Sequence, residues 1–351
     1  MRLTTTTIGA FPKPDYVPIT DWFQGAEGPD TVSPTAGYSV QMAGVKADEA
    51  EALFLRAAQE VIADQVAAGV DIPTDGEVRR ENYIHYHCRH LNGIDFETLT
   101  EKELRGGAYS ASLPTITGPI GARENFLPHD WKAAQSFTDR PVKVTLPGPM
   151  TITDTVANSY YDDDAKLGAD LAAAINKEFL ALAAAGCTHI QIDEPVFARK
   201  PEQALAYGFE NLDRCFHGAP EGVIRTVHMC CGYPDKLDNP NYAKADRNAY
   251  LRIADAIEDS SIQVVSLEDA HRHNDLSLLE HFKNTSVIFG AVAVAKSRVE
   301  SIDEIRDRLR AALEHIDADR LLAAPDCGLG LLGRDLAMAK LKNLCAAAHD
   351  L

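Results

Sequence analysis

One order of segments occurs twice in the chain, and it restricts the possible fold more than any other feature. Residues 48–77 consist of an Ala-rich amphipathic helical pattern, a glycine, a short apolar run and two acidic residues. Residues 164–195 repeat that order and end in "HIQIDEP". A helix, a glycine stop and a strand form the second half of a β/α unit. The repeat therefore predicts an α/β protein with parallel strands.

Further apolar runs bring the number of predicted strands to eight. They lie at residues 3–10, 70–77, 142–149, 189–195, 222–230, 263–270, 286–294 and 321–328. Eight strands that alternate with helices over a chain of this length are typical of a (β/α)8 TIM barrel. A doubly wound sheet is the competing fold, but no G-x-G-x-x-G turn follows the first strand. We predict one barrel domain over residues 1–351, with residues 91–139, rich in Gly, Pro and Ser, as an inserted loop or lid after the second strand.

Composition excludes several classes of function. The formal net charge is -18, whereas nucleic-acid binding needs a basic surface, so no nucleic-acid partner is expected. No run approaches eighteen consecutive apolar residues, and the N-terminus lacks the layout of a signal peptide. The cysteine count is seven, which is odd and argues against a disulfide framework. We expect a cytoplasmic enzyme with reduced thiols and no membrane association.

Polar residues gather where the predicted strands end. In a TIM barrel the carboxyl ends of the strands carry the chemistry, and acidic side chains are rarely buried there without a partner. The residues at these ends are Asp75, Glu77, Asp193, Glu194, His228, Cys230, Glu268, Asp269, Asp326 and Cys327. This clustering predicts the active site.

Four of these residues form a candidate zinc site. His228 and Cys230 are two positions apart on an extended segment, so both side chains leave the same face. Zinc binds imidazole, thiolate and carboxylate ligands in a tetrahedron. Glu268 and Cys327, at neighbouring strand ends, would complete the set. The alternative is that the cysteines are small buried apolar residues, as free cysteines often are.

The motifs "TTTIGAFP", "LPGPMTI", "IQIDEP", "HMC", "SLED" and "APDCGLG" occur in this order over nearly the whole chain. Together they resemble the catalytic barrel of the cobalamin-independent methionine synthase superfamily, which includes single-barrel members. The resemblance implies a methyltransferase in which zinc, held by His228, Cys230, Glu268 and Cys327, activates the thiol of homocysteine.

The same resemblance implies how the substrate is bound. Glu77 and Asp193 match the carboxylates that hold the homocysteine amino group, and Ile8, Gly9 and Ala10 match the backbone that holds its carboxylate. Glu77 could instead form a salt bridge with Arg79 or Arg80, and Asp193 could serve as a structural cap.

Departures from the family pattern concern the methyl donor. The segment that usually carries a pterin-stacking Trp offers Thr155 here, and Ala295 stands where a proton-donating His is expected. The chain also has no room for the family's extra N-terminal barrel. The donor is therefore open among methyltetrahydrofolate, a methylcorrinoid and another methyl donor, and a partner protein could deliver it. Lys296 is a candidate catalytic residue beside Ala295; alternatively it is a solvated lysine.

Two rival functions follow from the same residues. One is an alkyltransferase for another thiol, similar to the epoxyalkane–coenzyme M transferases. That function would be favoured if Arg79 or Arg80, rather than Glu77, faced the tail of the thiol, because a sulfonate would be repelled by Glu77 and Asp193. The other is a lyase similar to uroporphyrinogen decarboxylase, which needs basic residues for a polyanionic substrate and no metal.

Overall fold

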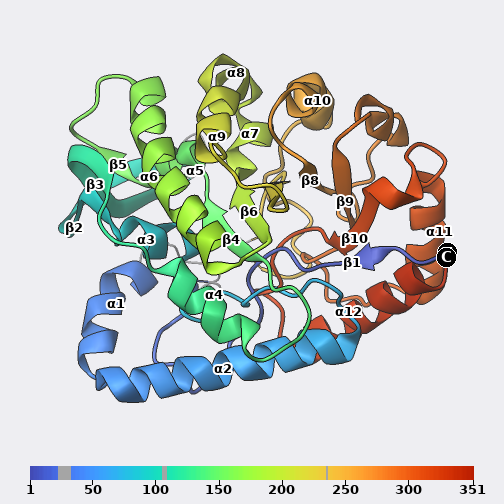
Figure 1. Cartoon of the computed structure of the whole chain (residues 1–351), viewed down its shortest axis with the longest axis horizontal. Helices are drawn as coiled ribbons and strands as arrows, with labels where there is room; N and C mark the ends of the chain where they lie inside the picture. The colour runs from blue at the N-terminus through green and yellow to red at the C-terminus, as the bar shows by residue number, and fades with distance from the viewer. Residues whose placement is uncertain (23–32, 105–108, 235) are drawn as a thin grey trace.

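The protein is described here by a computed structural model that covers residues 1–22, 33–104, 109–234 and 236–351. Its main feature is a curled sheet of seven parallel strands with helices around it (Figure 1). The strand order is β1-β10-β9-β8-β7-β6-β4, so strands adjacent in sequence are mostly adjacent in space. The strands are β1 (Thr4–Thr5), β4 (Val144–Pro147), β6 (His189–Asp193), β7 (Ile224–Met229), β8 (Val264–Glu268), β9 (Ser286–Val292) and β10 (Leu321–Pro325).

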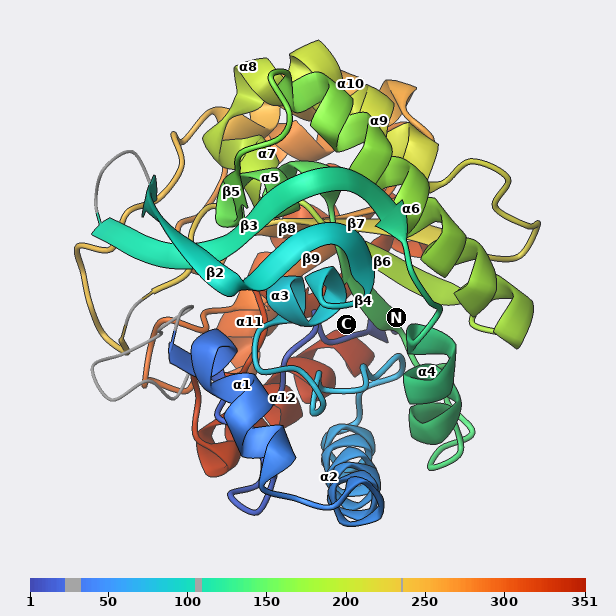
Figure 2. The ribbon, with the colours of Figure 1, turned by 90° about the vertical axis from the view of Figure 1, so that its left-hand side faces the viewer.

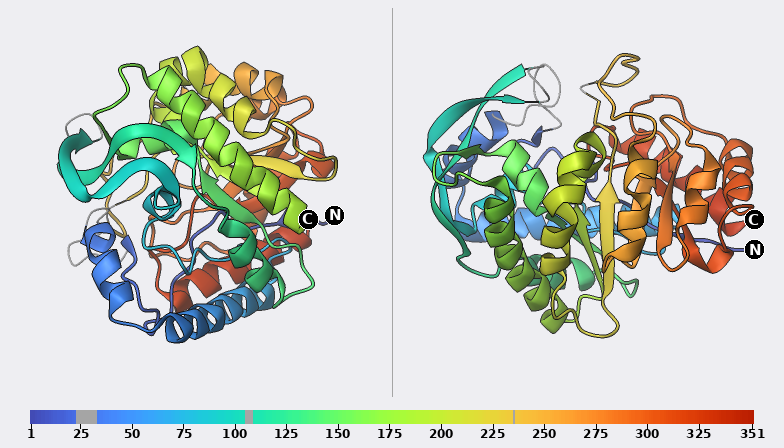
Figure 3. Two further views of the ribbon diagram at one scale, coloured as in Figure 1. Left: turned by 60° about the vertical axis from the view of Figure 1, so that its left-hand side comes forward. Right: turned by 90° about the horizontal axis from the view of Figure 1, so that it is seen from above.

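The helices cover the outside of this sheet, as the two views of Figure 3 show. Several, such as α10, bury an apolar face against the sheet and expose a polar face, as expected of an amphipathic helix. They are α1 (Ser33–Ala43), α2 (Ala47–Ala68), α3 (Tyr83–Cys88), α4 (Leu127–Gln135), α5 (Pro149–Thr155), α6 (Asp164–Ala185), α7 (Pro195–Arg199), α8 (Pro201–Gln203), α9 (Phe209–Cys215), α10 (Ala249–Asp259), α11 (Ile302–Ala312) and α12 (Arg334–His349). Shorter helical turns are η2 (Ala204–Gly208), η3 (Leu276–His281) and η4 (Ala318–Arg320).

The α/β class and the curled parallel sheet are confirmed, and seven of the eight predicted strands form; a closed eight-stranded barrel stays a prediction. The predicted strand at 70–77 differs from the prediction. It makes only two isolated parallel bridges, from Ile72 to Thr6 and from Thr74 to Lys143. Pro73 between them has no N–H to donate to a neighbouring strand. Farther on, Gly76 and Glu77 adopt positive φ angles of 66° and 55°, which end any extended backbone.

The region predicted as an inserted loop or lid, 91–139, is largely regular structure. Strands β2 (Leu91–Leu104) and β3 (Tyr109–Ala122) pair antiparallel, and β5 (Ala157–Asn158) joins β3. Figure 2 shows the long curved ribbon that β2 and β3 form. Lys102 on β2 donates hydrogen bonds of 2.8–3.1 Å to three backbone carbonyls at the end of α5. Residues 105–108, which the prediction included, lie outside the described residues, and a lid function stays a prediction.

The two ends of the chain lie side by side (Figure 3). The backbone N–H of Leu3 donates to the carbonyl of Ala348 at 2.8 Å, and that of Leu351 donates to Met1 at 2.9 Å. Helix α12 packs against β1, β10 and α2, so it ties the last segment to the first strand. Among the described helices, none has both the length and the apolar character required to cross a membrane.

The glycine that ends α6 gives a test of this packing. Gly186 has φ 108°, and a Cβ there would lie 3.2 Å from the Trp131 ring. Gly186→Ala should therefore lower stability by about 1–2 kcal/mol, because side chains are disfavoured in left-handed backbone. The apparent melting temperature should fall. Gly333→Ala is the matched control, since Gly333 has φ -67° and open space around its Cα. Equal melting temperatures for the two variants would contradict the account.

Candidate functional site

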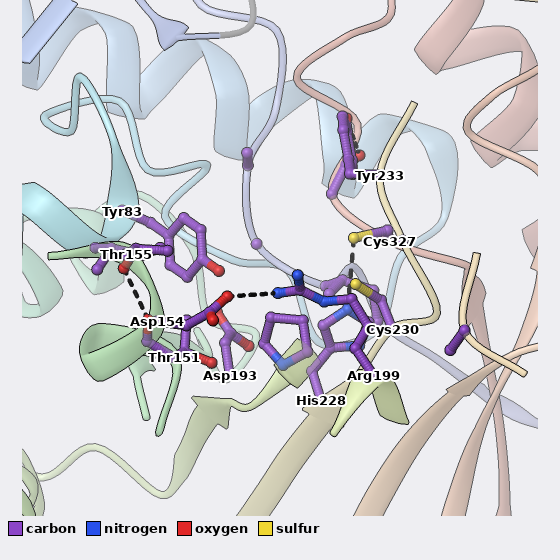
Figure 4. A pocket seen from close by; sticks show the side chains of 18 of the residues that line it. Tyr83, Thr151, Asp154, Thr155, Asp193, Arg199, His228, Cys230, Tyr233 and Cys327 are labelled. Carbon is purple, nitrogen blue, oxygen red and sulfur yellow. Dashed lines mark hydrogen bonds and ion pairs between the residues drawn. The ribbon is translucent and has the colours of Figure 1, made fainter. Parts of the chain in front are cut away.

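A cavity of about 540 Å³ opens at the carboxyl ends of the strands. Figure 4 shows side chains that converge on it from different strand ends. The predicted residues that line it are Ile8, Gly9, Ala10, Glu77, Asp193, His228, Cys230 and Cys327. The convergence follows from parallel pairing, because the carboxyl ends of parallel strands meet at one edge of the sheet.

Three predicted metal ligands form one group. His228, Cys230 and Cys327 each offer a ligand atom, and these atoms all lie within 4.8 Å of one another. The His228 ring is oriented by Ser266, whose hydroxyl lies 3.0 Å from Nδ1. Nε2 therefore faces the sulfur of Cys327, 3.4 Å away. A histidine whose second nitrogen is held in this way is the usual arrangement at a metal site.

Glu268, the fourth predicted ligand, lies outside this group. It is buried at the end of β8, where Oε2 accepts a 2.9 Å hydrogen bond from the backbone N–H of Cys231. Its other oxygen, Oε1, is buried and has no hydrogen-bond partner among the described residues. A buried acceptor without a partner is costly unless something absent from the polypeptide satisfies it. Glu268 thus has one oxygen available for an added cation.

The loop after Glu268 is anchored to the last strand. Asp326 accepts hydrogen bonds of 2.7–2.9 Å from the backbone N–H groups of Asp269, Ala270 and His271. Since Asp326 directly precedes Cys327, these bonds fix the end of β8 relative to that cysteine.

The two cysteines differ in acidity. A hydrogen bond from the Cys327 thiol, together with His228, holds the pKa of Cys230 well below its usual range. The same hydrogen bond raises the pKa of Cys327, and burial adds to the rise. Cys230 is therefore the thiolate of the pair, and the thiolate is the form that binds metals and reacts.

Two buried carboxylates lie on the other side of the cavity. Glu77 accepts a 2.8 Å hydrogen bond from the hydroxyl of Thr145, and a guanidinium nitrogen of Arg80 lies 3.8 Å from it. Gly9 allows this approach, because a Cβ there would come within 2.6 Å of the Glu77 carboxylate. Burial raises the pKa of Glu77. Glu77 also has a positive φ, the kind of backbone strain that gathers at functional sites.

Asp193 ends β6 and points into the cavity (Figure 4). Its Oδ1 accepts a 2.7 Å hydrogen bond from the side-chain amide of Gln191. Burial raises the pKa of Asp193 to about 7, although His228 opposes the shift. Its neighbour Glu194 faces away and accepts bonds from the backbone N–H groups of Met150 and Thr151 at the start of α5. Asp193 belongs to the site, whereas Glu194 is structural.

Lys296 does not line the cavity. It is half-buried beyond the end of β9, and its charge acts on the exposed Asp238. This position gives no support to a catalytic role for Lys296.

The arginines after Glu77 do not line the cavity either. Arg79 makes two 2.7 Å hydrogen bonds to Glu51. Arg80 contacts Asp75 and Thr145 at distances of 2.8–3.1 Å. Glu77, rather than either arginine, faces the cavity.

Several residues of the cavity were missed by sequence reasoning. The segment around Thr155 lacks an aromatic ring, as expected, but rings line the cavity from elsewhere: Trp22, Tyr83 and Tyr233. Trp22 and Tyr233 contact each other with ring centroids 5.7 Å apart. Three cations also line the wall, namely Arg199, Lys200 and Lys244. Tyr83 was not missed, because its position in the aromatic run directly after Glu77 allows a place at the mouth of the site; the others lie in loops and helix ends where no periodic pattern marks them.

Comparisons with known proteins agree over the whole chain. The family model described as the catalytic domain of the cobalamin-independent synthase matches residues 3–350. The methionine synthase of Thermococcus kodakarensis is 30% identical over 345 residues, 97% of this chain and 91% of that protein. That of Saccharolobus solfataricus is 30% identical over 348 residues, with coverages of 97% and 92%. A B12-independent methionine synthase from Shewanella sp. W3-18-1, solved in complex with selenomethionine, has 31% identity and a TM-score of 0.85 over 99% of this chain and 97% of that one.

The asymmetry between the cysteines predicts their reactivity. In protein treated with a strong chelator, iodoacetamide should alkylate Cys230 rapidly at pH 7, because a lowered pKa keeps it a thiolate there. The rate should fall only at a pH well below 9, and mass spectrometry of peptides would give the pH profile. Cys187, whose pKa burial raises to about 12, is the internal control and should stay unmodified. A Cys230 profile centred near pH 9 would contradict the assignment.

Proposed function

The chain belongs to the cobalamin-independent methionine synthase family of methyltransferases, and we propose that it transfers a methyl group to the thiol of homocysteine, forming methionine. The observation that carries this proposal is the pairing, in one cavity, of two buried carboxylates with a His/Cys/Cys group. An amino acid with a thiol side chain matches both halves. Its ammonium would pair with Glu77 and Asp193, and its sulfur would lie toward Cys230.

We propose that the group binds zinc through His228, Cys230 and Cys327, with Glu268 as the fourth ligand. Imidazole, thiolate and carboxylate are the donors that zinc prefers. The unpartnered Oε1 of Glu268 and the oriented Nε2 of His228 support this set. When bound, zinc would lower the pKa of a ligating thiol, so that the thiolate is present at neutral pH.

In this proposal the chain's own residues orient the substrate and exclude water. Asp193 and Glu77 would hold the ammonium group, and the backbone of Ile8 to Ala10 would lie beside the substrate carboxylate. Reaction would form a carbon–sulfur bond and break the bond from the methyl group to its donor. The donor stays open among methyltetrahydrofolate, a methylcorrinoid and another methyl compound. Trp22, Tyr233 and Lys244 also line the cavity, and they would contact the methyl donor.

We also propose that the bridges at Ile72 and Thr74 complete an eight-membered barrel, since they link the two edge strands of the sheet. Arg199, Lys200 and Lys244 in the cavity wall are basic residues of the kind that an anionic substrate needs, but two other features argue against the rival functions. A coenzyme M-like sulfonate would meet Glu77 and Asp193 rather than Arg79 or Arg80. A decarboxylase-like lyase has no use for the His/Cys/Cys group.

The metal proposal predicts a loss of zinc on single substitution. Protein purified in buffer with zinc should hold about one zinc per chain, and Cys230→Ser should hold almost none, because a serine hydroxyl is a poor ligand. Elemental analysis after dialysis gives the stoichiometry. The matched control is Cys231→Ser, since the hydrogen bond from Cys231 to Glu268 comes from its backbone N–H and is kept in the variant. Equal zinc in Cys230→Ser and the control would contradict the ligand set.

The acceptor proposal predicts proton release. Homocysteine added to zinc-loaded protein at fixed pH should release about one proton per site, because the thiol binds as thiolate. Coenzyme M should release none, since its sulfonate would face two carboxylates. A pH-stat or indicator dye measures the release. Proton release with coenzyme M alone would contradict the homocysteine proposal and support the rival alkyltransferase function.

A further inference from the structure

Lys143 is a buried cation without a partner. It directly precedes β4, the residue is only 2% exposed, and Nζ has no hydrogen-bond partner among the described residues. By contrast, the buried Lys340 lies 2.8 Å from Glu300. An unpaired buried ammonium is costly, so a lysine at this position needs a reason. Burial accordingly lowers the pKa of Lys143 to about 7, and Asp193 is the acid that opposes this shift.

The strand register places Lys143 below Asp193, one of the two carboxylates proposed to bind the substrate ammonium. Thr145 pairs with Gln191, and Pro147 pairs with Asp193. Side chains two positions apart share one face of a strand, so Lys143 lies on the same face as Thr145, whose hydroxyl reaches Glu77 inside the sheet. On the neighbouring strand β6, Gln191 and Asp193 lie on that same face of the sheet, because Gln191 pairs with Thr145.

Gln191 has an unpartnered atom that complements the lysine. Its amide nitrogen donates two 2.7 Å hydrogen bonds, to Asp193 Oδ1 and to the backbone carbonyl of Ile8. Its Oε1 is buried and unpartnered among the described residues. A buried donor without an acceptor therefore lies in the same polar region as a buried acceptor without a donor. One internal water could bridge them, because both atoms are polar and enclosed.

The negative charges of Glu77 and Asp193, the two carboxylates proposed to bind the substrate ammonium, are compensated differently. Glu77 has the Arg80 guanidinium 3.8 Å away, whereas Asp193 has no ion pair within the described part of the chain. The charged or titratable groups that act on Asp193 include His228, Glu77 and Lys143, and the neighbouring Tyr83 and Glu194 also interact with it. Lys143 is the only lysine among them, and it approaches from below while the substrate would approach from above.

On the basis of the function proposed above, we propose that Lys143 is a positioning residue for substrate binding: it is the buried counter-charge of Asp193 and holds the Gln191 amide so that Asp193 faces the substrate ammonium. Lys143 itself contacts no substrate, because it does not line the cavity. Its effect should therefore appear in the affinity for the amino acid and should depend on the presence of Asp193.

A double-mutant cycle tests this role. Isothermal titration calorimetry with L-methionine, the proposed product, measures affinity in zinc-loaded protein and needs no methyl donor. Lys143→Met should weaken methionine binding about tenfold in the wild-type background. In the Asp193→Asn background the same change should weaken it by less than about twofold, because the carboxylate it serves is gone. Lys340→Met is the control for loss of a buried lysine; it should lower stability and leave affinity unchanged.

Lys143→Gln provides a second measurement if the methionine variant does not fold. Glutamine keeps a hydrogen-bond donor without the charge, so affinity should fall, but less than for Lys143→Met. Unchanged affinity in the foldable Lys143 variants would overturn the inference, as would equal losses in both Asp193 backgrounds. If the wild-type protein binds neither homocysteine nor methionine, the proposed function itself is overturned, and this inference with it.

Discussion

The parallel register of β6, β7 and β8 determines where the polar groups of the site lie. Asp193 is paired with His228, and His228 with Ser266, so carboxylate, imidazole and hydroxyl occupy one level of the sheet. A shift of one residue in any pairing would turn a side chain to the helical layer outside, because the side-chain period of a strand is two. Tyr250 reinforces the register: its hydroxyl donates to the carbonyl of Met229 and accepts from the N–H of Glu268.

That register concentrates negative charge in a buried space, and the surrounding structure compensates for it. Glu77, Asp193, Glu268 and Asp326 are each less than a tenth exposed. Arg80 lies near Glu77, and backbone N–H groups satisfy Asp326. Asp193 and Glu268 keep raised pKa values because burial outweighs their internal partners. An added cation would favour the charged form of each acid, an ammonium beside Asp193 and a metal beside Glu268.

The sequence was sufficient to predict what depends on strand periodicity. Seven strands lie within the predicted runs, and the two-residue spacing of His228 and Cys230 agrees with their position in one group with Cys327. The prediction of a strand at 70–77 was wrong because a proline interrupts the apolar run. The effect of its missing N–H on strand pairing becomes clear only when the neighbouring strands are known. The antiparallel β2–β3 ribbon was missed because its Gly, Pro and Ser content is typical of loops. Lys143 could not be identified at all, since the burial of a lysine depends on the complete fold.

The division of the cavity explains why the acceptor is easier to assign than the methyl donor. The proposed acceptor side is built mainly from strand ends, whose positions the sheet fixes and whose residues match the family motifs. Trp22, Tyr233 and Lys244 also line the cavity, but they lie on connecting segments between strands. Such segments can differ among proteins of one fold without disturbing the sheet, and specificity commonly resides in them. The lack of an aromatic residue in the sequence segment around Thr155 therefore does not leave the cavity without a ring. Trp22, Tyr83 and Tyr233 provide rings from other segments. An aromatic contact to a donor would therefore come from positions that differ from the one in the family pattern.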